Sequence, residues 1–528
     1  MIRDLSQVEA PGLEVRTPLC IIGAGTAGIF LACQLRALGV DVLLLETGDR
    51  FARSANEMAQ TCAQRGIRYR GAEQGRSFGL GGTSVLWGGQ MIPLTAADMQ
   101  ARPAVGIDAW PIDHAELTNH LAHVKQRLGL RAGDDAGESA LSARRYPGLS
   151  AFDPDFALRL SEWLPFGMRN FAQAFADPLR QDSGLVVWLN AGVVRLQCDA
   201  AEMGRILAVE ARSANGRMLN VRPDLVVICA GALESTRLLL AFDESTSGRL
   251  TANGAPLGRY FADHLSVTCG RFACRDWTRY NHAVAPVFSG GVMRTPRLEI
   301  APAAQDRLAL TSAFVHFTFV THGDTGFDVI RSFLRQRQGE RQRLGLSPRR
   351  LGRVVQDVGA MAYWRVVHRQ LWIPRPADLL LQVDIEQVPN WNSRLSLADD
   401  LDRLGRKRLV IDWQITPEDI RVIRTVAQRT VQAWDGSRLR NLARLEMTMP
   451  LRFDDFETQY DVYHPTGSLR MGSQPANSVT DANLRVWGLE NCYVSSTAVF
   501  PSAGSANPGL MHLALTARLA EHLASRIR

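Results

Sequence analysis

The 528-residue sequence has few of the features that mark a disulfide-stabilised, zinc-binding or membrane-spanning protein. Its eight cysteines (20, 33, 62, 198, 229, 269, 274 and 492) are scattered, and neither a CxxC nor an HExxH motif is present. A disulfide framework or a structural metal site is therefore not expected, and the thiols fit a reducing compartment. No apolar run approaches the ~20 residues that cross a bilayer, and the N-terminus lacks the pattern of a secretory signal. We expect a cytoplasmic protein with no membrane span and no metal.

A broad basic surface is also missing, although the net charge is +7. Residues 331–353 hold eight arginines against one acid, Glu340, and the rest of the chain is balanced. Binding to a phosphate backbone requires a basic face of larger extent, so no nucleic-acid partner is expected. The simpler interpretation of this stretch is a solvated surface excursion. A docking site for an acidic substrate or carrier is the alternative.

The length and the composition predict a globular protein of two domains. Hydrophobic residues make up 46% and charged residues 21% of the chain, which is typical of globular proteins. A chain of this length is too long to fold around one hydrophobic core of ordinary size. Buried-strand patterns occur near both ends and around residues 185–230, whereas longer alternating strands such as 379–388 occupy the middle. The simplest arrangement is a nucleotide-binding domain in three pieces, with a substrate domain inserted between them.

A glycine-rich turn lies between an apolar strand at residues 18–23 and an apolar helical pattern. Gly23, Gly25 and Gly28 have the GxGxxG spacing, in which the glycines permit a tight turn, a close approach of pyrophosphate and close helix packing. Glu46 ends the next strand, 18 residues beyond Gly28, where a carboxylate can accept hydrogen bonds from ribose hydroxyls. An acid at this position argues against a 2′-phosphate, so the pattern indicates NAD or FAD.

A second glycine-rich loop, GLGGTSVLWGG, occupies residues 79–89. It has no role in a simple nicotinamide domain, but its glycines would let the backbone lie against a large flat cofactor. A flexible loop without a ligand is the alternative. The loop favours FAD over NAD.

These and further motifs occur in the order found in the glucose–methanol–choline (GMC) oxidoreductases, which the chain resembles over nearly its full length. The remaining motifs are WPI (110–112), NAGVVRL (190–196), CAGALESTRLLL (229–240), LGRYFADH (257–264), YHPTGSLRMG (463–472), STAVFPSAG (496–504) and ANPGLMHLAL (506–515). The resemblance implies an α/β fold, in which a Rossmann-like FAD-binding domain carries an inserted α+β substrate domain built on an antiparallel sheet. The expected boundaries are 1–95, 180–268 and 456–528 for the FAD-binding domain, and 96–179 and 269–455 for the substrate-binding domain.

The resemblance also implies a tightly held FAD and the residues that contact it. These residues are Gly23, Gly25, Gly28, Glu46, Gly81, Gly82, Thr83, Trp87, Gly88, Val193, Ala230, Ala498 and Pro508. Some members of the family attach FAD covalently through a histidine in the glycine loop. The corresponding position here is Leu86, so we predict a non-covalent flavin.

Alcohol oxidation removes a hydroxyl proton and delivers a hydride to flavin N5, and a histidine suits the first step. The resemblance places His464, in the motif HPTGSLRMG, over the flavin as the catalytic base. Asn507, in SANPG, matches the second active-site position, where its amide can donate to the developing alkoxide. Asn507 could instead only cap the helix that begins near Pro508. We interpret His264, in ADHL, as structural.

The substrate is less well defined by the sequence. Gln382, Asp384 and Glu386 share one face of a strand, which lines the substrate cavity or faces solvent. Trp364 and Trp391 could stack on a sugar ring, although aromatic residues are more often core. We predict oxidation of a CH–OH group of a sugar-like or polyol substrate to a carbonyl, with oxygen or a quinone-type compound as the electron acceptor. A non-redox FAD-containing lyase of the same fold, or a flavin-binding scaffold without activity, are the alternatives.

Overall fold

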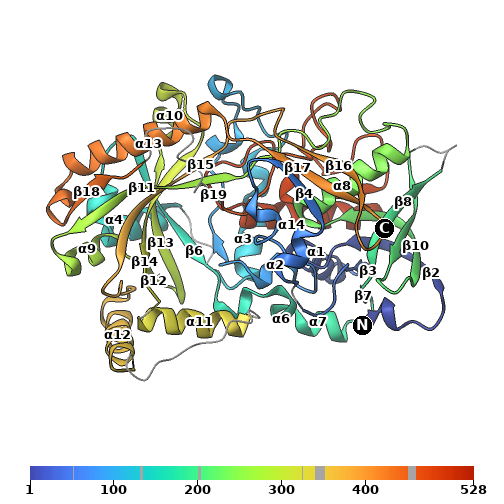
Figure 1. Cartoon of the computed structure of the whole chain (residues 1–528), viewed down its shortest axis with the longest axis horizontal. Helices are drawn as coiled ribbons and strands as arrows, with labels where there is room; N and C mark the ends of the chain where they lie inside the picture. The colour runs from blue at the N-terminus through green and yellow to red at the C-terminus, as the bar shows by residue number, and fades with distance from the viewer. Residues whose placement is uncertain are drawn as a thin grey trace.

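The computed structural model describes residues 1–51, 53–130, 135–199, 204–323, 325–338, 351–449 and 460–527. A mainly parallel sheet lies toward the end of the molecule that holds the N-terminus, and an antiparallel sheet lies at the opposite end (Figure 1). Each sheet has its own cluster of buried apolar side chains. The predicted α/β fold class is therefore confirmed.

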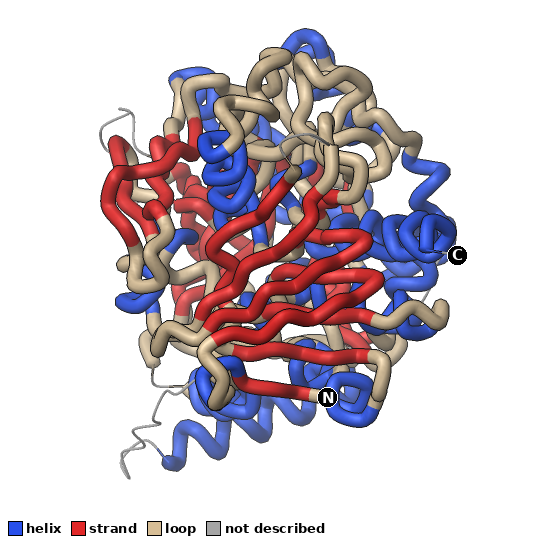
Figure 2. Tube along the Cα trace, turned by 90° about the vertical axis from the view of Figure 1, so that its right-hand side faces the viewer, coloured by secondary structure: helices blue, strands red, loops and turns tan. Residues whose placement is uncertain are grey.

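The parallel sheet is the Rossmann-like part of the fold. Its strands, in spatial order, are β1 (Ile2–Asp4), β7 (Leu185–Leu189), β3 (Val42–Leu45), β2 (Gly12–Ile22), β10 (Met218–Ile228), β9 (Ile206–Arg212) and β8 (Gly192–Cys198), with β20 (Cys492–Val494) paired to β10. Figure 2 shows strands of this sheet side by side above the N-terminus. The predicted opening βαβ unit is present as β2, α1 (Thr26–Ala37) and β3. The apolar side of α1 is buried, and α14 (Gly509–Ile527) packs against both α1 and α3 (His114–Arg127).

The antiparallel sheet follows the order β18 (Ala443–Met447), β11 (His264–Cys274), β15 (Asp378–Glu386), β14 (Ala313–Val320), β13 (Val292–Ile300), β6 (Phe156–Trp163) and β5 (Gln90–Met91). Short strands β12 (Val287–Ser289) and β19 (Tyr460–Asp461) pair with β13 and β11. The apolar residues of β15 alternate with polar ones and join the core beneath α13 (Pro417–Gly436), which packs on this sheet. The opposite face is consequently the polar one.

A third, three-stranded sheet was not expected from the sequence. It consists of β16 (Arg394–Leu401), β17 (Lys407–Trp413) and β4 (Cys62–Gly66), and β17 pairs in parallel with β4 across a separation of more than 340 residues. Helix α8 (Gly231–Ser245) packs against β16 and β17. Other α-helices before β14 are α2 (Ala55–Ala59), α4 (Asp135–Arg145), α5 (Pro147–Ser150), α6 (Phe171–Ala174), α7 (Ala176–Gln181), α9 (Trp277–Val284) and α10 (Pro302–Leu308).

The predicted domain boundaries remain a prediction, and the segment 96–179 contributes to both cores. Side chains from 110–130 and 164–179 are buried with the parallel sheet, whereas those from 146–160 are buried with the antiparallel sheet. Short stretches of this segment therefore alternate between the two halves of the molecule.

Part of the arginine-rich stretch forms two helices, α11 (Gly326–Gln338) and α12 (Leu351–Tyr363), and α12 continues into a π-helical turn, Trp364–His368. Both helices lie along the lower edge of the molecule in Figure 1, below the antiparallel sheet. Four of the arginines, at positions 341, 343, 349 and 350, are outside the described residues. None of the helices in the described part of the chain is long and apolar enough to cross a membrane.

Candidate active site

A cavity of about 470 Å³ extends from the glycine turn after β2 to the loops around residues 464 and 507. Its walls come from the parallel sheet, the glycine loop at 82–90, α8 and the start of α14. Eleven of the fifteen predicted site residues line it: Gly23, Gly25, Glu46, Gly82, Thr83, Trp87, Val193, Ala230, His464, Asn507 and Pro508. The structure thus brings together residues that are up to 485 positions apart in the sequence.

Four predicted residues, Gly28, Gly81, Gly88 and Ala498, do not line the cavity. A Cβ atom on Gly28 would lie 1.9 Å from the carbonyl oxygen of Gly23, so this glycine allows α1 to pack against the turn. Ala498 is fully buried. These positions support the walls of the cavity instead of forming its surface.

The end of the cavity near β2 has the features that a dinucleotide requires. Gly25 is the N-cap of α1 and offers no side-chain cap, so the N–H groups of the first turn are available beside the cavity. Glu46 is buried, and its carboxylate accepts hydrogen bonds from the N–H groups of Ala24 (2.9 Å), Gly48 (2.8 Å) and Gly79 (2.9 Å). Burial raises the pKa of Glu46, and these N–H groups oppose that rise. The donor set and the fixed carboxylate fit an FAD.

His464 lies at the other end of the cavity, where its ring contacts a second histidine. Its backbone N–H donates to Asp263 (2.9 Å), and its Nδ1 lies 3.1 Å from Nδ1 of His264. His264 is buried at the start of β11, and its Nε2 lies 2.7 Å from the carbonyl oxygen of Gly504. The two rings are nearly perpendicular, at 88°.

These contacts determine where the protons sit on the two rings. A carbonyl oxygen only accepts, so Nε2 of His264 carries a proton that it donates to Gly504. Burial lowers the pKa of His264, which keeps the ring neutral and leaves its Nδ1 as an acceptor. His464 must then donate from Nδ1, and its Nε2 holds a lone pair. Nε2 makes no hydrogen bond to the described residues.

The charge state of His464 follows from its surroundings. Burial, His264 and Arg297 lower the pKa of His464 to about 3, although Asp384 opposes this effect. The ring is therefore neutral near pH 7, in the form that accepts a proton. Burial also lowers the pKa of His512, another residue lining the cavity, to about 4.

Asn507 is held by a buried arginine on β13. Nη1 of Arg297 lies 3.5 Å from Oδ1 of Asn507, and Nη2 donates to both the carbonyl and the hydroxyl of Ser505. Because a cation faces the amide oxygen, the amide NH₂ group is the end that remains for other partners. Burial lowers the pKa of Arg297 to about 10, so it is still charged at neutral pH.

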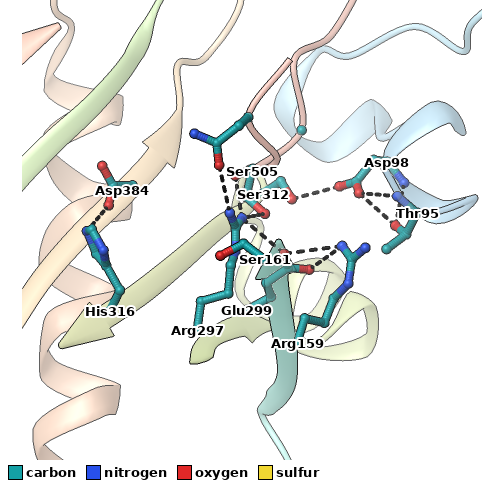
Figure 3. A network of polar contacts seen from close by, with 12 residues as sticks. Thr95, Asp98, Arg159, Ser161, Arg297, Glu299, Ser312, His316, Asp384 and Ser505 are labelled. Atoms are coloured by element: carbon teal, nitrogen blue, oxygen red, sulfur yellow. Dashed lines mark hydrogen bonds and ion pairs between the residues drawn. The ribbon is translucent and has the colours of Figure 1, made fainter. Parts of the chain in front are cut away.

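Arg297 belongs to a network of polar contacts on the inner face of the antiparallel sheet (Figure 3). Glu299 pairs with Arg297 (3.0 Å) and Arg159 (3.0 Å), and His316 pairs with Asp384 (2.6 Å). The register places Arg297 beside His316. The network supports the loop that carries Asn507.

The polar residues predicted on strand 379–388 do share one face, and Asp384 and Glu386 are buried. Glu386 pairs with Arg102 (2.7 Å) and accepts from the N–H of Gly504 (2.9 Å). Asp384 and Glu386 therefore face the interior and not solvent, but they do not line the described cavity. The contact of Glu386 with Gly504 fixes the loop whose carbonyl accepts from His264.

Asp263, His264 and His464 are close enough to hold a metal ion, since their ligand atoms lie within 4.8 Å of one another. The carboxylate of Asp263 already accepts from Tyr69 Oη (2.7 Å) and from the N–H groups of His264 (2.7 Å) and His464 (2.9 Å). Both imidazoles also bond each other. The contacts are those of a hydrogen-bonded support for His464.

Comparison with protein families agrees with this geometry. Residues 389–516 match a family model described as GMC oxidoreductase, and residues 18–272 match one described as FAD dependent oxidoreductase. The chain belongs to the GMC oxidoreductase family. It is an FAD-dependent oxidoreductase.

Named relatives and solved structures align with this GMC oxidoreductase over almost its whole length. It is 25% identical to 6′′′-hydroxyparomomycin C oxidase of Streptomyces lividus, over 99% of this chain and 95% of that protein. It is 24% identical to paromamine 6′-oxidase of Streptomyces fradiae, over 96% and 90%. The crystal structure of pyridoxine 4-oxidase from Mesorbium loti has a similar fold, with a TM-score of 0.60 at 17% identity over 96% and 99% of the two chains.

Sequence reasoning missed two residues of this GMC oxidoreductase that contact the predicted catalytic pair. His264 was interpreted as structural, but its ring bonds the ring of His464, and Arg297 gave no signal in the sequence. The ADHL motif was the available clue for His264. The two tryptophans considered for sugar stacking do not line the cavity: Trp364 stacks on Trp372, and Trp391 packs against Tyr260.

Proposed function

We propose that this enzyme oxidises a CH–OH group of a sugar-like, aminoglycoside-type substrate to a carbonyl, with non-covalently bound FAD. His464 is the base that accepts the hydroxyl proton, and Asn507 donates a hydrogen bond to the substrate oxygen. The names of two relatives that align over nearly the whole chain, both of them oxidases of paromomycin-type compounds, support this substrate class.

One observation carries the proposal, namely the chain of hydrogen bonds from Gly504 through His264 to His464. It leaves a lone pair on Nε2 of a neutral imidazole at the cavity, which is what a general base requires. The proton taken from the substrate hydroxyl would be held at Nε2 of His464. FAD, when bound, supplies the acceptor for the hydride from the substrate carbon.

Asn507 and Arg297 act on the oxygen that loses the proton. The amide NH₂ of Asn507 is directed away from Arg297, so it can donate to an oxygen that becomes negative. An amide does not compete for the proton. Arg297 orients this amide and places a buried positive charge behind it, which favours negative charge on the substrate oxygen.

The cofactor would lie along the cavity with its two ends held by different elements. The first turn of α1 would hold the pyrophosphate, Glu46 the ribose, and the backbone of Val193 the adenine. The loop that contains Trp87 would line the flavin ring. Leu86, at the position where some relatives carry a histidine, has no nucleophilic atom, and this supports non-covalent binding.

The first test measures bleaching of the flavin under anaerobic conditions. Paromamine, simple sugars, polyols and aliphatic alcohols are added to the wild type, to His464→Ala and to His123→Ala. His123 is an exposed histidine on α3 and is the matched control. We expect paromamine to bleach the wild type and the control, and the His464→Ala rate to fall by about 10²–10⁴-fold. A flavin that stays oxidised while product forms would contradict oxidation and favour a lyase.

The second test is mass spectrometry of the denatured chain. We expect the mass of the unmodified polypeptide, with free FAD released into solution. A flavin adduct on the polypeptide would contradict non-covalent binding.

A further inference from the structure

The face of α12 that points away from the protein is apolar. Val355, Gly359 and Ala362 are spaced by four and three residues, so they share one side of the helix, and all are exposed. Asp357 and Trp364 lie on the opposite side and are buried. Asp357 accepts from the N–H of Gly326 at the start of α11 (2.9 Å). The outward side of α12 therefore presents apolar and small residues, where a surface helix usually presents polar ones.

This apolar face continues beyond α12. The π-helical turn exposes Val366 (76%) and Val367 (57%), next to Tyr363 (56%). On α11, Phe333 is half exposed. Trp364 stacks on Trp372 with ring centroids 4.8 Å apart, so the turn rests on a packed aromatic base. Isolated exposed valines are common, but a contiguous run of exposed apolar side chains marks an interaction site.

The same two helices and the segment after them carry only one sign of exposed charge. Among the described residues 326–338 and 351–377, the two acids are Asp328, which is half-buried, and Asp357, which is buried. The exposed charged side chains there are Arg331, Arg335, Arg337, Arg353, Arg365, Arg369 and Arg375. We call Arg337, Arg353, Arg365, Arg369 and Arg375, together with the apolar residues Phe333, Val355, Val358, Tyr363, Val366 and Val367, the α11–α12 surface.

We propose that the α11–α12 surface binds an anionic lipid bilayer, with the apolar side chains at the headgroup boundary and the arginines on lipid phosphates. Aliphatic and aromatic side chains flanked by arginines are what an interfacial helix needs. A second copy of the chain is a poorer partner, because pairing two such surfaces would bring positive charges together, and like charges repel. The lipid phosphates supply charge opposite to that of the exposed arginines Arg337, Arg353 and Arg375.

The surface is also fixed to the rest of the molecule. Gln338, the last residue of α11, donates to the carbonyl oxygens of Ser84 (3.2 Å) and Trp87 (2.8 Å), and its own carbonyl accepts from Asn170 (2.9 Å). Helix α11 therefore connects the α11–α12 surface to the glycine loop beside the cavity. A bilayer bound there would hold the enzyme in one orientation.

The test is sedimentation of the FAD-loaded enzyme with two kinds of vesicle. One kind is phosphatidylcholine alone, and the other is an equal mixture of phosphatidylcholine and phosphatidylglycerol. We expect binding to the anionic vesicles, weaker at high salt because exposed charges are screened, and little binding to phosphatidylcholine. Equal binding to both vesicles, or to neither, would overturn the proposal.

Variants identify the surface that binds. Val355→Ser with Val366→Ser removes apolar contact, and Arg337→Gln, Arg353→Gln and Arg375→Gln together remove charge. At about fivefold per arginine, the triple variant should partition about a hundredfold more weakly. The matched control, Leu401→Ser with Arg403→Gln, changes an exposed leucine and an exposed arginine on the hairpin between β16 and β17 and should bind as the wild type does.

Two further measurements keep the result interpretable. Thermal unfolding and flavin content of each variant test whether it is folded. Both should match the wild type, because none of the substituted residues lines the cavity. Analytical ultracentrifugation without vesicles tests the competing partner. A wild-type dimer that Val355→Ser with Val366→Ser dissociates would overturn the proposal in favour of a second copy. Retained vesicle binding by both surface variants would overturn it as well.

Discussion

Replacing His264 by alanine tests whether this ring directs the proton chemistry of His464. The substitution removes the acceptor of the His464 Nδ1–H and the donor to Gly504, at contacts of 3.1 Å and 2.7 Å. A hydrogen bond contributes about 0.5–1.5 kcal/mol, so its loss lowers the population of the competent tautomer by up to about tenfold. Without the contact to His264, the His464 ring can also rotate, which further reduces its alignment with the substrate hydroxyl. We expect kcat to fall by about 10–100-fold.

The assay is the rate of anaerobic flavin reduction as a function of pH, with His123→Ala as the control. His264 contributes to the low pKa of His464, so its removal should raise that pKa and move the acid limb of kcat/KM to higher pH. A merely structural residue would lower stability without moving this limb. A folded His264→Ala enzyme with unchanged kcat and an unmoved acid limb would refute the reasoning.

Three further outcomes are expected. Gly28→Ala should cost about 3 kcal/mol or more of unfolding free energy in chemical denaturation, because the new methyl would lie 1.9 Å from the Gly23 carbonyl. Glu46→Gln should lose FAD during gel filtration, read from flavin absorbance, because an amide cannot accept from three N–H groups as the carboxylate does. The folded-state pKa values of His464 (about 3) and His512 (about 4) lie below the unfolded value of ~6.5. Unfolding free energy should therefore be maintained above pH ~6.5 and fall between about pH 6.5 and 4, by up to ~1.4 kcal/mol per pH unit for each histidine.

Each of these expectations has a contrary result. Gly359→Ala is the control for Gly28→Ala, because a Cβ on Gly359 meets nothing within 4 Å; equal stability of the two variants would contradict the packing argument. Full FAD retention by Glu46→Gln would show that the carboxylate is dispensable. Denaturation curves that coincide at pH 7 and pH 5 would contradict the assignment of neutral buried histidines.

The nucleotide end of the cavity could be predicted from the sequence because its geometry is local. Gly23, Gly25 and Gly28 lie in one turn, and Glu46 ends the strand that follows, so spacing alone places them together. The predicted polar face of strand 379–388 also follows from the alternation of apolar and polar residues over positions 381–386. Such features depend on the backbone of one or two neighbouring elements.

The support of His464 could not be predicted, because it depends on packing between distant segments. His264 and His464 are 200 positions apart and meet only because β11 begins beside the loop that precedes Pro465. The outward valines of α12 are a second case, since periodicity reveals an apolar face but not which way it points. The burial of Asp357 and Trp364 settles that question only in the structure.

The order in which the cavity walls occur along the chain has a consequence for biosynthesis. The first lining residue is Ile22 and the last is His512, near the start of the final helix. Strand β20, at 492–494, pairs with β10 of the parallel sheet. The nascent polypeptide therefore cannot enclose its flavin until residues as late as His512 have been synthesised, and formation of the cavity depends on long-range assembly.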